Sequence, residues 1–217
     1  MARLVLSGYY GFNNTGDEAV LYSIVRLFRS LQPDLKFTVL SNDPVKTSKL
    51  YNVDAVNRWN FKEVFKALRS ADLLISGGGS LLQDVTSSRS LIYYLGVVAL
   101  AKLLRKPVVY YAQGVGPITS EWGQKLIPLI SNKADVITVR DQASKDLLLK
   151  LKVNRPPIYV TADAVLSLYH REIERHPGQE VLKRHGVDWE KRQPLIGISV
   201  REYRNLSRYL NVLAPLA

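Results

Sequence analysis

Short apolar runs alternate with longer amphipathic segments over the first 165 residues. The segment 17–31 places Ala19, Ile24 and Phe28 near helical spacing and ends before Pro33, which predicts a helix. The predicted strands are 4–6, 37–40, 72–76, 107–111, 135–139 and 157–160, and the other predicted helices are 61–69, 91–104, 122–132 and 142–151. This alternation is typical of a doubly wound, mostly parallel sheet. We therefore predict an α/β, Rossmann-like fold.

The domain organisation follows from changes along the same pattern. Residues 1–168 are predicted to form the Rossmann-like domain, and the charged stretch 169–193 to form a linker or surface helix. The apolar run 194–201 predicts a new buried strand, after which little chain remains. We expect 194–217 to be the start of a second, truncated Rossmann-like domain, so that the chain is a fragment.

Composition narrows the classes of partner. The chain has 217 residues, 47% of them hydrophobic, no cysteine and a net charge of +11. The absence of cysteine excludes disulfides and thiolate metal sites, and we predict neither a metal nor a cofactor. Three classes of anionic partner suit a basic chain, and nucleic acid is the least favoured because the basic residues are scattered rather than clustered. The others are an anionic membrane surface and phosphorylated substrates. The N-terminal apolar run is too short for a signal peptide, and 91–104 is too short and polar to span a bilayer.

Three glycine-rich strand ends carry the candidate chemistry: 8–18, 76–84 and 111–117. Ligands of parallel α/β sheets bind at the carboxyl edge, where strands end and helices begin. Glycine allows close backbone approach or a positive φ, and N–H groups at a helix start favour anions. Three such turns on one edge predict a binding site.

The first of these loops combines amide and aromatic side chains. Asn13 and Asn14, beside Gly16, with the rings of Tyr10 and Phe12, suit a sugar, which binds planar hydrogen-bonding groups and an aromatic face. Asp17 and Glu18 open the following helix, where carboxylates are stabilised by the helix dipole. Simple capping is the preferred interpretation of Glu18; for Asp17, capping and ligand binding are equally open.

The other strand ends offer groups for an anion. Gly77, Gly78, Gly79 and Ser80 follow a strand and are predicted to open a helix, either as an anion-binding nest or for close packing. Gln113 and Gly114 follow the next strand. Arg140 and Arg201, each at a strand end, can grip a carboxylate or phosphate with a guanidinium fork. Alternatively, Arg140 forms a surface ion pair with Asp141 or Asp146.

Taken together, 8–19, 76–84, 111–117 and 138–141 resemble the corresponding motifs of polysaccharide pyruvyl transferases, in the same order. The resemblance extends through 161–163 and 197–201, and the nearest type is the bacterial cell-wall one linked to surface-layer anchoring. It implies a protein similar to GT-B glycosyltransferases, with two Rossmann-like domains facing a cleft, of which this chain holds the N-terminal, acceptor-side half.

The resemblance implies transfer of the pyruvyl group of phosphoenolpyruvate to a sugar as a ketal, the acceptor being β-N-acetylmannosamine (β-ManNAc) of a lipid-linked cell-wall polysaccharide precursor. Asp17 and Arg140 are the expected catalytic residues. The substrate contacts are expected from Tyr10, Phe12, Asn13, Asn14, Gly16, Gly77, Gly78, Gly79, Ser80, Gln113, Gly114 and Arg201. The family's C-terminal histidine and lysine residues have no counterpart here, so the fragment alone is expected to be inactive.

Two other functions remain open at this stage. One is a nucleotide-sugar glycosyltransferase of the same architecture, and the other is a non-catalytic domain that binds a glycan or an anion. The expected location is cytoplasmic, with peripheral contact at the anionic inner face of the cell membrane and no nucleic-acid partner.

Overall fold

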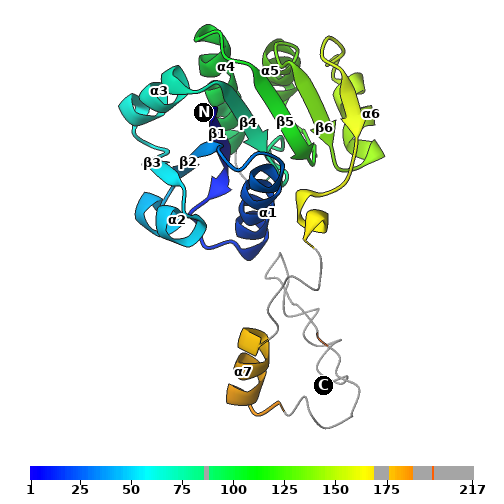
Figure 1. Ribbon diagram of the computed structural model, residues 1–217. Helices are drawn as coiled ribbons and strands as arrows, with labels where there is room; N and C mark the ends of the chain where they lie inside the picture. The colour runs from blue at the N-terminus through cyan, green and yellow to red at the C-terminus, as the bar shows by residue number, and fades with distance from the viewer. Residues whose placement is uncertain (86–87, 169–175, 188–196, 198–217) are drawn as a thin grey trace. The chain divides into compact units, whose positions relative to one another are not determined.

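The protein is described here by a computed structural model that covers residues 1–85, 88–168, 176–187 and 197. It divides into two compact units, Met1–Tyr169 and His170–Ala217. The first unit contains a seven-stranded sheet whose neighbouring strands all pair in parallel, in the order β3-β2-β1-β4-β5-β6-β7 (Figure 1). The predicted α/β, doubly wound fold is therefore confirmed.

Strands and helices alternate along this unit from β1 to the 3-10 turn η1. The strands are β1 (Arg3–Tyr10), β2 (Lys36–Ser41), β3 (Asp54–Asn57), β4 (Leu73–Gly77), β5 (Val108–Gln113), β6 (Val136–Val139) and β7 (Ile158–Val160). The helices are α1 (Thr15–Leu31), α2 (Pro44–Tyr51), α3 (Phe61–Ser70), α4 (Ser88–Leu103), α5 (Glu121–Ser131), α6 (Gln142–Lys150) and the 3-10 turn η1 (Ala164–Ser167).

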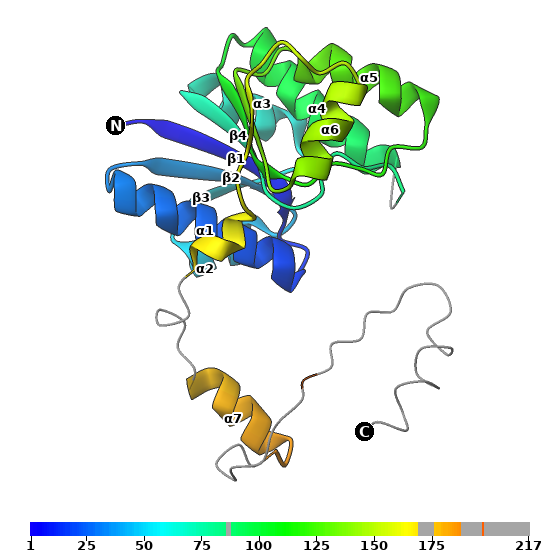
Figure 2. The ribbon, with the colours of Figure 1, turned by 90° about the vertical axis from the view of Figure 1, so that its right-hand side faces the viewer.

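Helices cover the sheet from two sides, with α1 and α2 on one side and α3 to α6 on the other (Figure 2). The apolar stripe of α1, which includes Leu21 and Ile24, packs against Leu6, Val39 and other residues of one sheet face. Leu68, Leu91, Ile127 and Leu148 from α3 to α6 pack against the opposite face. Burial of these two apolar layers is the main stabilising contribution.

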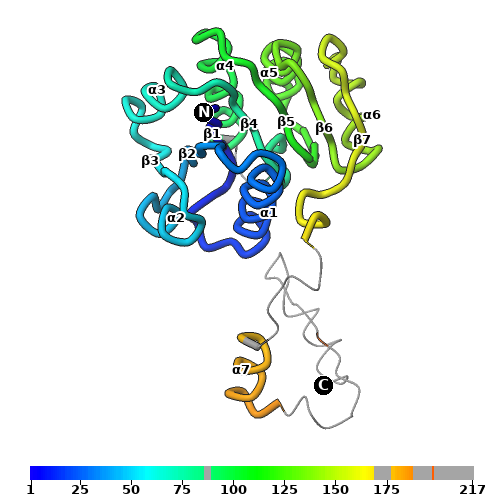
Figure 3. The backbone as a smooth tube through the Cα atoms, in the orientation of Figure 1, coloured from blue at the N-terminus to red at the C-terminus, as the bar shows by residue number. Residues whose placement is uncertain are grey.

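The strand order reverses direction between β1 and β4. From β1 the chain moves outward through β2 to β3, then returns to β4 beside β1 and continues to β7 at the far edge (Figure 3). The register pairs Ser7 of β1 with Ser76 of β4. Ligands of open parallel sheets bind at such a switch point, in the crevice outside the carboxyl ends of the strands. The glycine-rich loops after β1 and β4 both begin there.

Three elements of the first unit were not predicted: α2, β3 and the short 3-10 turn η1. The sequence of helix α2 has no apolar stripe, because the helix buries only Thr47. Its start is marked instead by the N-cap Asp43 and by Pro44 in the first turn. Strand β3, at the sheet edge, contains no fully buried residue. The pattern of apolar positions predicts neither α2 nor β3, because these two elements bury few side chains.

Other boundaries also differ from prediction. Helix α4 begins at Ser88, so the Gly77–Gly79 segment leads into a loop. The prediction that this segment opens a helix is therefore wrong. Helix α5 contains Pro128 and continues to Ser131. Strands β1 and β5 extend to Tyr10 and Gln113, which places parts of two loop motifs inside strands.

The second unit contains α7 (His176–Arg184), which lies in the stretch predicted as a charged linker or helix. The strand predicted at 194–201, with Arg201, lies outside the described residues except for Gly197. Within the described part of the chain, none of the helices combines the length and the apolar character needed to cross a bilayer.

Candidate active site at the carboxyl edge of the sheet

The loop after β1 is shaped by its own amide side chains. Asn14 is the N-cap of α1, and its Oδ1 accepts hydrogen bonds from the backbone N–H groups of Gly16 and Asp17 at 3.0 and 3.4 Å. Asn13 adopts a positive φ of 59°, and its Oδ1 accepts from Lys46 Nζ. Both asparagines are exposed, but the amide oxygen of Asn14 is already used in capping.

Glu18 fastens this loop to the rest of the unit. Its Oε1 accepts from the Gly11 N–H at 2.9 Å, and its Oε2 accepts from the Tyr51 hydroxyl at 2.6 Å. Burial and the bond to Glu18 raise the pKa of the Tyr51 phenol. Glu18 is therefore a structural residue, but it does not cap the helix as expected: its carboxylate accepts from Gly11 and Tyr51, and the N-cap of α1 is Asn14.

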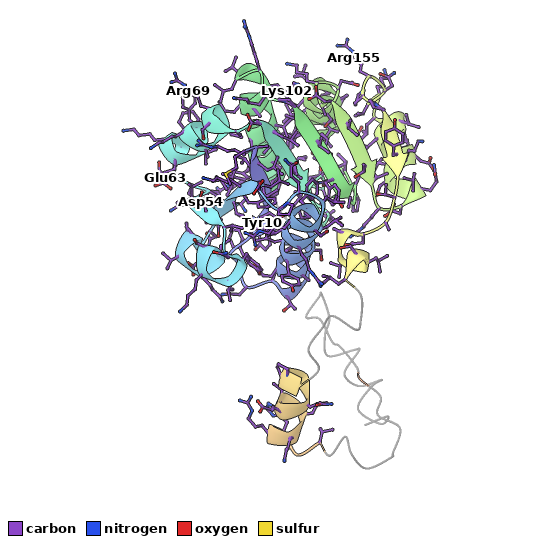
Figure 4. All side chains as sticks on the ribbon, in the orientation of Figure 1. Tyr10, Asp54, Glu63, Arg69, Lys102 and Arg155 are labelled. Atoms are coloured by element: carbon purple, nitrogen blue, oxygen red, sulfur yellow. The ribbon has the colours of Figure 1, made fainter. Side chains whose placement is uncertain are left out.

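Tyr10 is a core residue, which corrects its assignment as a sugar contact. Its side chain is fully buried in the layer that contains α1 (Figure 4), and its hydroxyl donates to the Gly77 carbonyl at 2.9 Å. Burial, together with the nearby Asp17 carboxylate, raises the pKa of the phenol. Because β1 runs through Tyr10, strand alternation turns Tyr9 and Tyr10 to opposite faces of the sheet, and Tyr10 enters the layer of α1 together with Leu4 and Leu6.

The turn after β4 brings backbone and carboxylate together. Gly78 and Gly79 have positive φ values of 64° and 70°. The Gly78 N–H donates to the Tyr111 carbonyl, so it is not available for an anion. The N–H groups of Gly79 and Ser80 donate to no acceptor among the described residues. A Cβ on Gly79 would lie 2.9 Å from Asp17 Oδ1, so the glycine allows this carboxylate to approach the turn.

Arg140 reaches the same turn from the end of β6. Its Nη2 donates to Ser80 Oγ and its Nη1 to Asp163 Oδ2, both at 3.1 Å, and its Nε lies 3.5 Å from Asp141 Oδ2. The predicted ion pair with Asp141 is present but is longer than the one with Asp163. Asp146 instead accepts from Gln142. A half-buried guanidinium is thus held across the ends of β4, β6 and β7.

Gly114 explains how this guanidinium can lie so close to the backbone. A Cβ there would lie 2.8 Å from Cζ, Nε and Nη2 of Arg140. The glycine after β5 therefore provides the space that the arginine occupies. Gln113 beside it is fully buried, with Nε2 donating to the Ser76 carbonyl at 2.9 Å, so its side chain is a core group, which corrects its assignment as a substrate contact.

Asp84 is a site-supporting residue that the sequence interpretation did not select. It is 8% exposed and accepts from the N–H and hydroxyl groups of both Thr119 and Ser120. Burial would raise its pKa, but these hydrogen bonds outweigh burial and lower the pKa to about 2. The carboxylate joins the loop after β4 to the loop after β5. Its place in the second glycine motif was the available signal.

The two predicted catalytic residues therefore flank one short segment, Gly79–Ser80. Asp17 lies beside Gly79, and Arg140 bonds Ser80. The segment is thus bordered by a carboxylate, by a guanidinium that also pairs with Asp141 and Asp163, and by two backbone N–H groups. No group of acidic, histidine or cysteine side chains in the described part of the chain has the arrangement of a metal site.

Fold and site together define an α/β protein in which polar groups gather around Gly79–Ser80 at the carboxyl edge of a Rossmann-like sheet. The sequence profile of the polysaccharide pyruvyl transferase family matches residues 14–212. The chain therefore belongs to the polysaccharide pyruvyl transferase family. Curated protein sequences contain no significant match.

Solved structures support the fold. HepE (Alr3699) of Anabaena, solved with UDP and glucose, is 12% identical with a TM-score of 0.54, and the match covers 86% of this chain and 50% of HepE. MnaA of S. aureus, solved with UDP, is 10% identical with a TM-score of 0.50, again over 86% and 50%. The chain thus spans about half the length of these two proteins.

Proposed function

We propose that the parent protein transfers the pyruvyl group of phosphoenolpyruvate to a sugar as a cyclic ketal, and that this chain forms the acceptor-side half of the active site. The observation that carries the proposal is the position of Asp17 and Arg140 on the two sides of Gly79–Ser80. Membership of the pyruvyl transferase family supports the reaction class.

The reaction defines what each group must do. Two sugar hydroxyl oxygens bond to C2 of phosphoenolpyruvate, and the bond from C2 to the phosphate oxygen breaks. Of the two protons that the hydroxyls lose, the equivalent of one is taken up by the methylene carbon and the other leaves with inorganic phosphate. Asp17 orients an acceptor hydroxyl and accepts its hydrogen bond. Arg140 and the N–H groups of Gly79 and Ser80 hold an anionic group of the substrates. We assign the acid that protonates the methylene carbon to the part of the parent protein beyond this chain.

The acceptor that we propose is β-ManNAc of a lipid-linked cell-wall polysaccharide precursor. Exposed amides at Asn13 and Asn14 support a sugar at the end of β1. A net charge of +11 suits a pyrophosphoryl lipid and a peripheral position at the anionic cytoplasmic face of the membrane.

The test is turnover by the full-length parent enzyme. Incubation with phosphoenolpyruvate and a β-ManNAc-containing acceptor should release phosphate and yield a ketal product of matching mass. Arg140→Lys keeps the charge but loses the fork, and is expected to raise the KM for phosphoenolpyruvate. Folded enzyme that releases no phosphate with any such acceptor would contradict the proposal.

A nucleotide-sugar glycosyltransferase is the second candidate, because the structural neighbours HepE and MnaA were solved with UDP. Calorimetric titration separates the two functions. Saturable binding of UDP-glucose or UDP-N-acetylglucosamine to the parent enzyme, with none of phosphoenolpyruvate, would favour the glycosyltransferase.

A further inference from the structure

A buried arginine organises a cluster of aromatic rings beside the β1 loop. Arg58 follows β3, is 4% exposed, and donates from Nη1 to the Gly8 carbonyl at 2.8 Å. Its Cζ lies 4.1 to 5.3 Å from four ring centroids, those of Phe12, Trp59, Tyr93 and Tyr94. No carboxylate of the described residues lies within ion-pair distance of it. The cation is therefore stabilised by the faces of the rings, and it holds them in place.

Trp59 is exposed and yet fixed. Its side chain is 62% exposed, but its Nε1 donates to Asn42 Oδ1 and its backbone N–H to Asn57 Oδ1, both at 2.9 Å. Asn42 also donates from Nδ2 to the Gly11 carbonyl at 3.4 Å, which connects the indole to the β1 loop. Rotamer freedom of the indole is thus lost before any ligand binds, which favours binding.

A second aromatic surface lies at the end of β1. Tyr9 and Phe12 stack with ring centroids 4.1 Å apart and planes 6° apart, and Tyr9 is 37% exposed. The Arg58 Cζ lies 5.1 Å from the centroid of Phe12 and 5.1 Å from that of Trp59, so the guanidinium connects the stacked pair to the indole. We call Tyr9, Phe12 and Trp59 the aromatic platform. It spans the carboxyl ends of β1 and β3, next to the loop that carries Asp17.

We propose that the aromatic platform binds an N-acetylhexosamine ring of the acceptor glycan, the residue next to the sugar that receives the pyruvyl group. The inference rests on the proposed function. A pyranose presents C–H groups on one face, and these pack on the electron-rich face of an aromatic ring, while its hydroxyl and acetamido groups bond to polar side chains around it.

The surroundings of the platform favour a sugar over a lipid surface. Exposed amides border Trp59 at Asn42, Asn57 and Asn60, and Asn13 follows Phe12 in the loop. The NH2 groups of Asn13 and Asn57 donate to no acceptor among the described residues, because only their amide oxygens are bonded, and insertion into hydrocarbon would take these groups out of water without a replacement. Hydroxyl and acetamido groups of a glycan provide such replacements.

The test measures binding without the donor. The parent enzyme is titrated by calorimetry with a disaccharide of two N-acetylhexosamines that ends in β-ManNAc. Trp59→Ala is expected to raise the Kd at least tenfold, whereas Trp59→Phe, which keeps a ring face, raises it less than threefold. The matched control is Tyr159→Ala, which removes a 57% exposed ring on β7 at the opposite edge of the sheet and leaves the Kd unchanged.

Several outcomes would overturn the proposal. One is an unchanged Kd in folded Trp59→Ala, and another is the absence of disaccharide binding to the wild type at millimolar concentration. A third is a Trp59→Ala variant that no longer binds phosphatidylglycerol vesicles but keeps its affinity for the disaccharide, which would show that Trp59 contacts lipid. If Trp59→Ala does not fold, Trp59→Leu removes the ring and keeps the bulk. Trp59-dependent binding without phosphate release would contradict the proposed function and leave the platform intact.

Discussion

Replacement of Asp84 by asparagine is expected to destabilise the first unit through a single, well-defined site. The carboxylate accepts from two N–H groups and two hydroxyls of Thr119 and Ser120. An amide of the same shape keeps one oxygen but places an NH2 group against the donors of Ser120. A buried donor without an acceptor costs free energy, and so does the loss of charge-assisted bonds.

The magnitude follows from the pKa of Asp84. The pKa is about 2 in the folded protein, against an ordinary value of 3.8 for an aspartate side chain. This difference corresponds to about 2 kcal/mol of folding free energy at neutral pH. Because the folded state has the lower pKa, the contribution is complete above the unfolded pKa and is lost as the pH falls toward 2; about half remains at pH 3.

The assay is urea unfolding followed by circular dichroism at pH 7 and pH 3. Asp84→Asn should be about 2 to 3 kcal/mol less stable than the wild type at pH 7, and the difference should be about halved at pH 3. Asp146→Asn is the control, because its exposed carboxylate accepts only from Gln142 among the described residues, and it should change stability by less than about 0.5 kcal/mol. A difference below about 0.5 kcal/mol at pH 7, or one that is equal at both pH values, would refute the reasoning.

Three further substitutions in the parent enzyme test the residues around the segment Gly79–Ser80. Asp17→Asn keeps the shape of the side chain and removes its charge, so kcat/KM should fall on the order of 100-fold while the melting temperature stays nearly constant; normal activity would reduce Asp17 to a helix-start residue. Gly114→Ala places a methyl 2.8 Å from the Arg140 guanidinium, so steady-state kinetics should show kcat/KM for phosphoenolpyruvate reduced at least about tenfold; unchanged kinetics would show that the guanidinium position is unimportant. Tyr10→Phe removes the hydroxyl that donates to Gly77, so urea unfolding should show a loss of about 1 kcal/mol with kcat/KM preserved; a selective loss of activity would contradict the core role.

Prediction from the sequence succeeded where burial leaves a strong local pattern. The apolar runs of β1, β2, β4, β5 and β6, and the apolar stripe of α1, pack against the two core layers. Their periodicity therefore predicts strands and a helix from the sequence. Helix α2 and strand β3 failed this test because the edge of the sheet buries almost none of their side chains. For α2, the caps at Asp43 and Asn52 were the better signal.

The burial of Tyr10, which was predicted to contact a sugar, shows why loop motifs are harder to interpret. Both rings precede Gly11, and either suits a sugar on composition alone. The direction of each depends on how far β1 continues, since alternation along a strand decides which side chain enters the core. Pairing with the neighbouring strands extends β1 to Tyr10 and buries that ring.

The sequence by itself determined the chemistry available at each strand end: a carboxylate at Asp17, a glycine turn before Ser80, a small residue at Gly114 and a guanidinium at Arg140. Only the tertiary structure decided which of these groups meet. The order β1-β4-β5-β6 places Asp17 beside Gly79 and lays Arg140 over Gly114 toward Ser80. Strand order results from the packing of whole layers, and local residue spacing does not record contacts between segments so far apart in the chain.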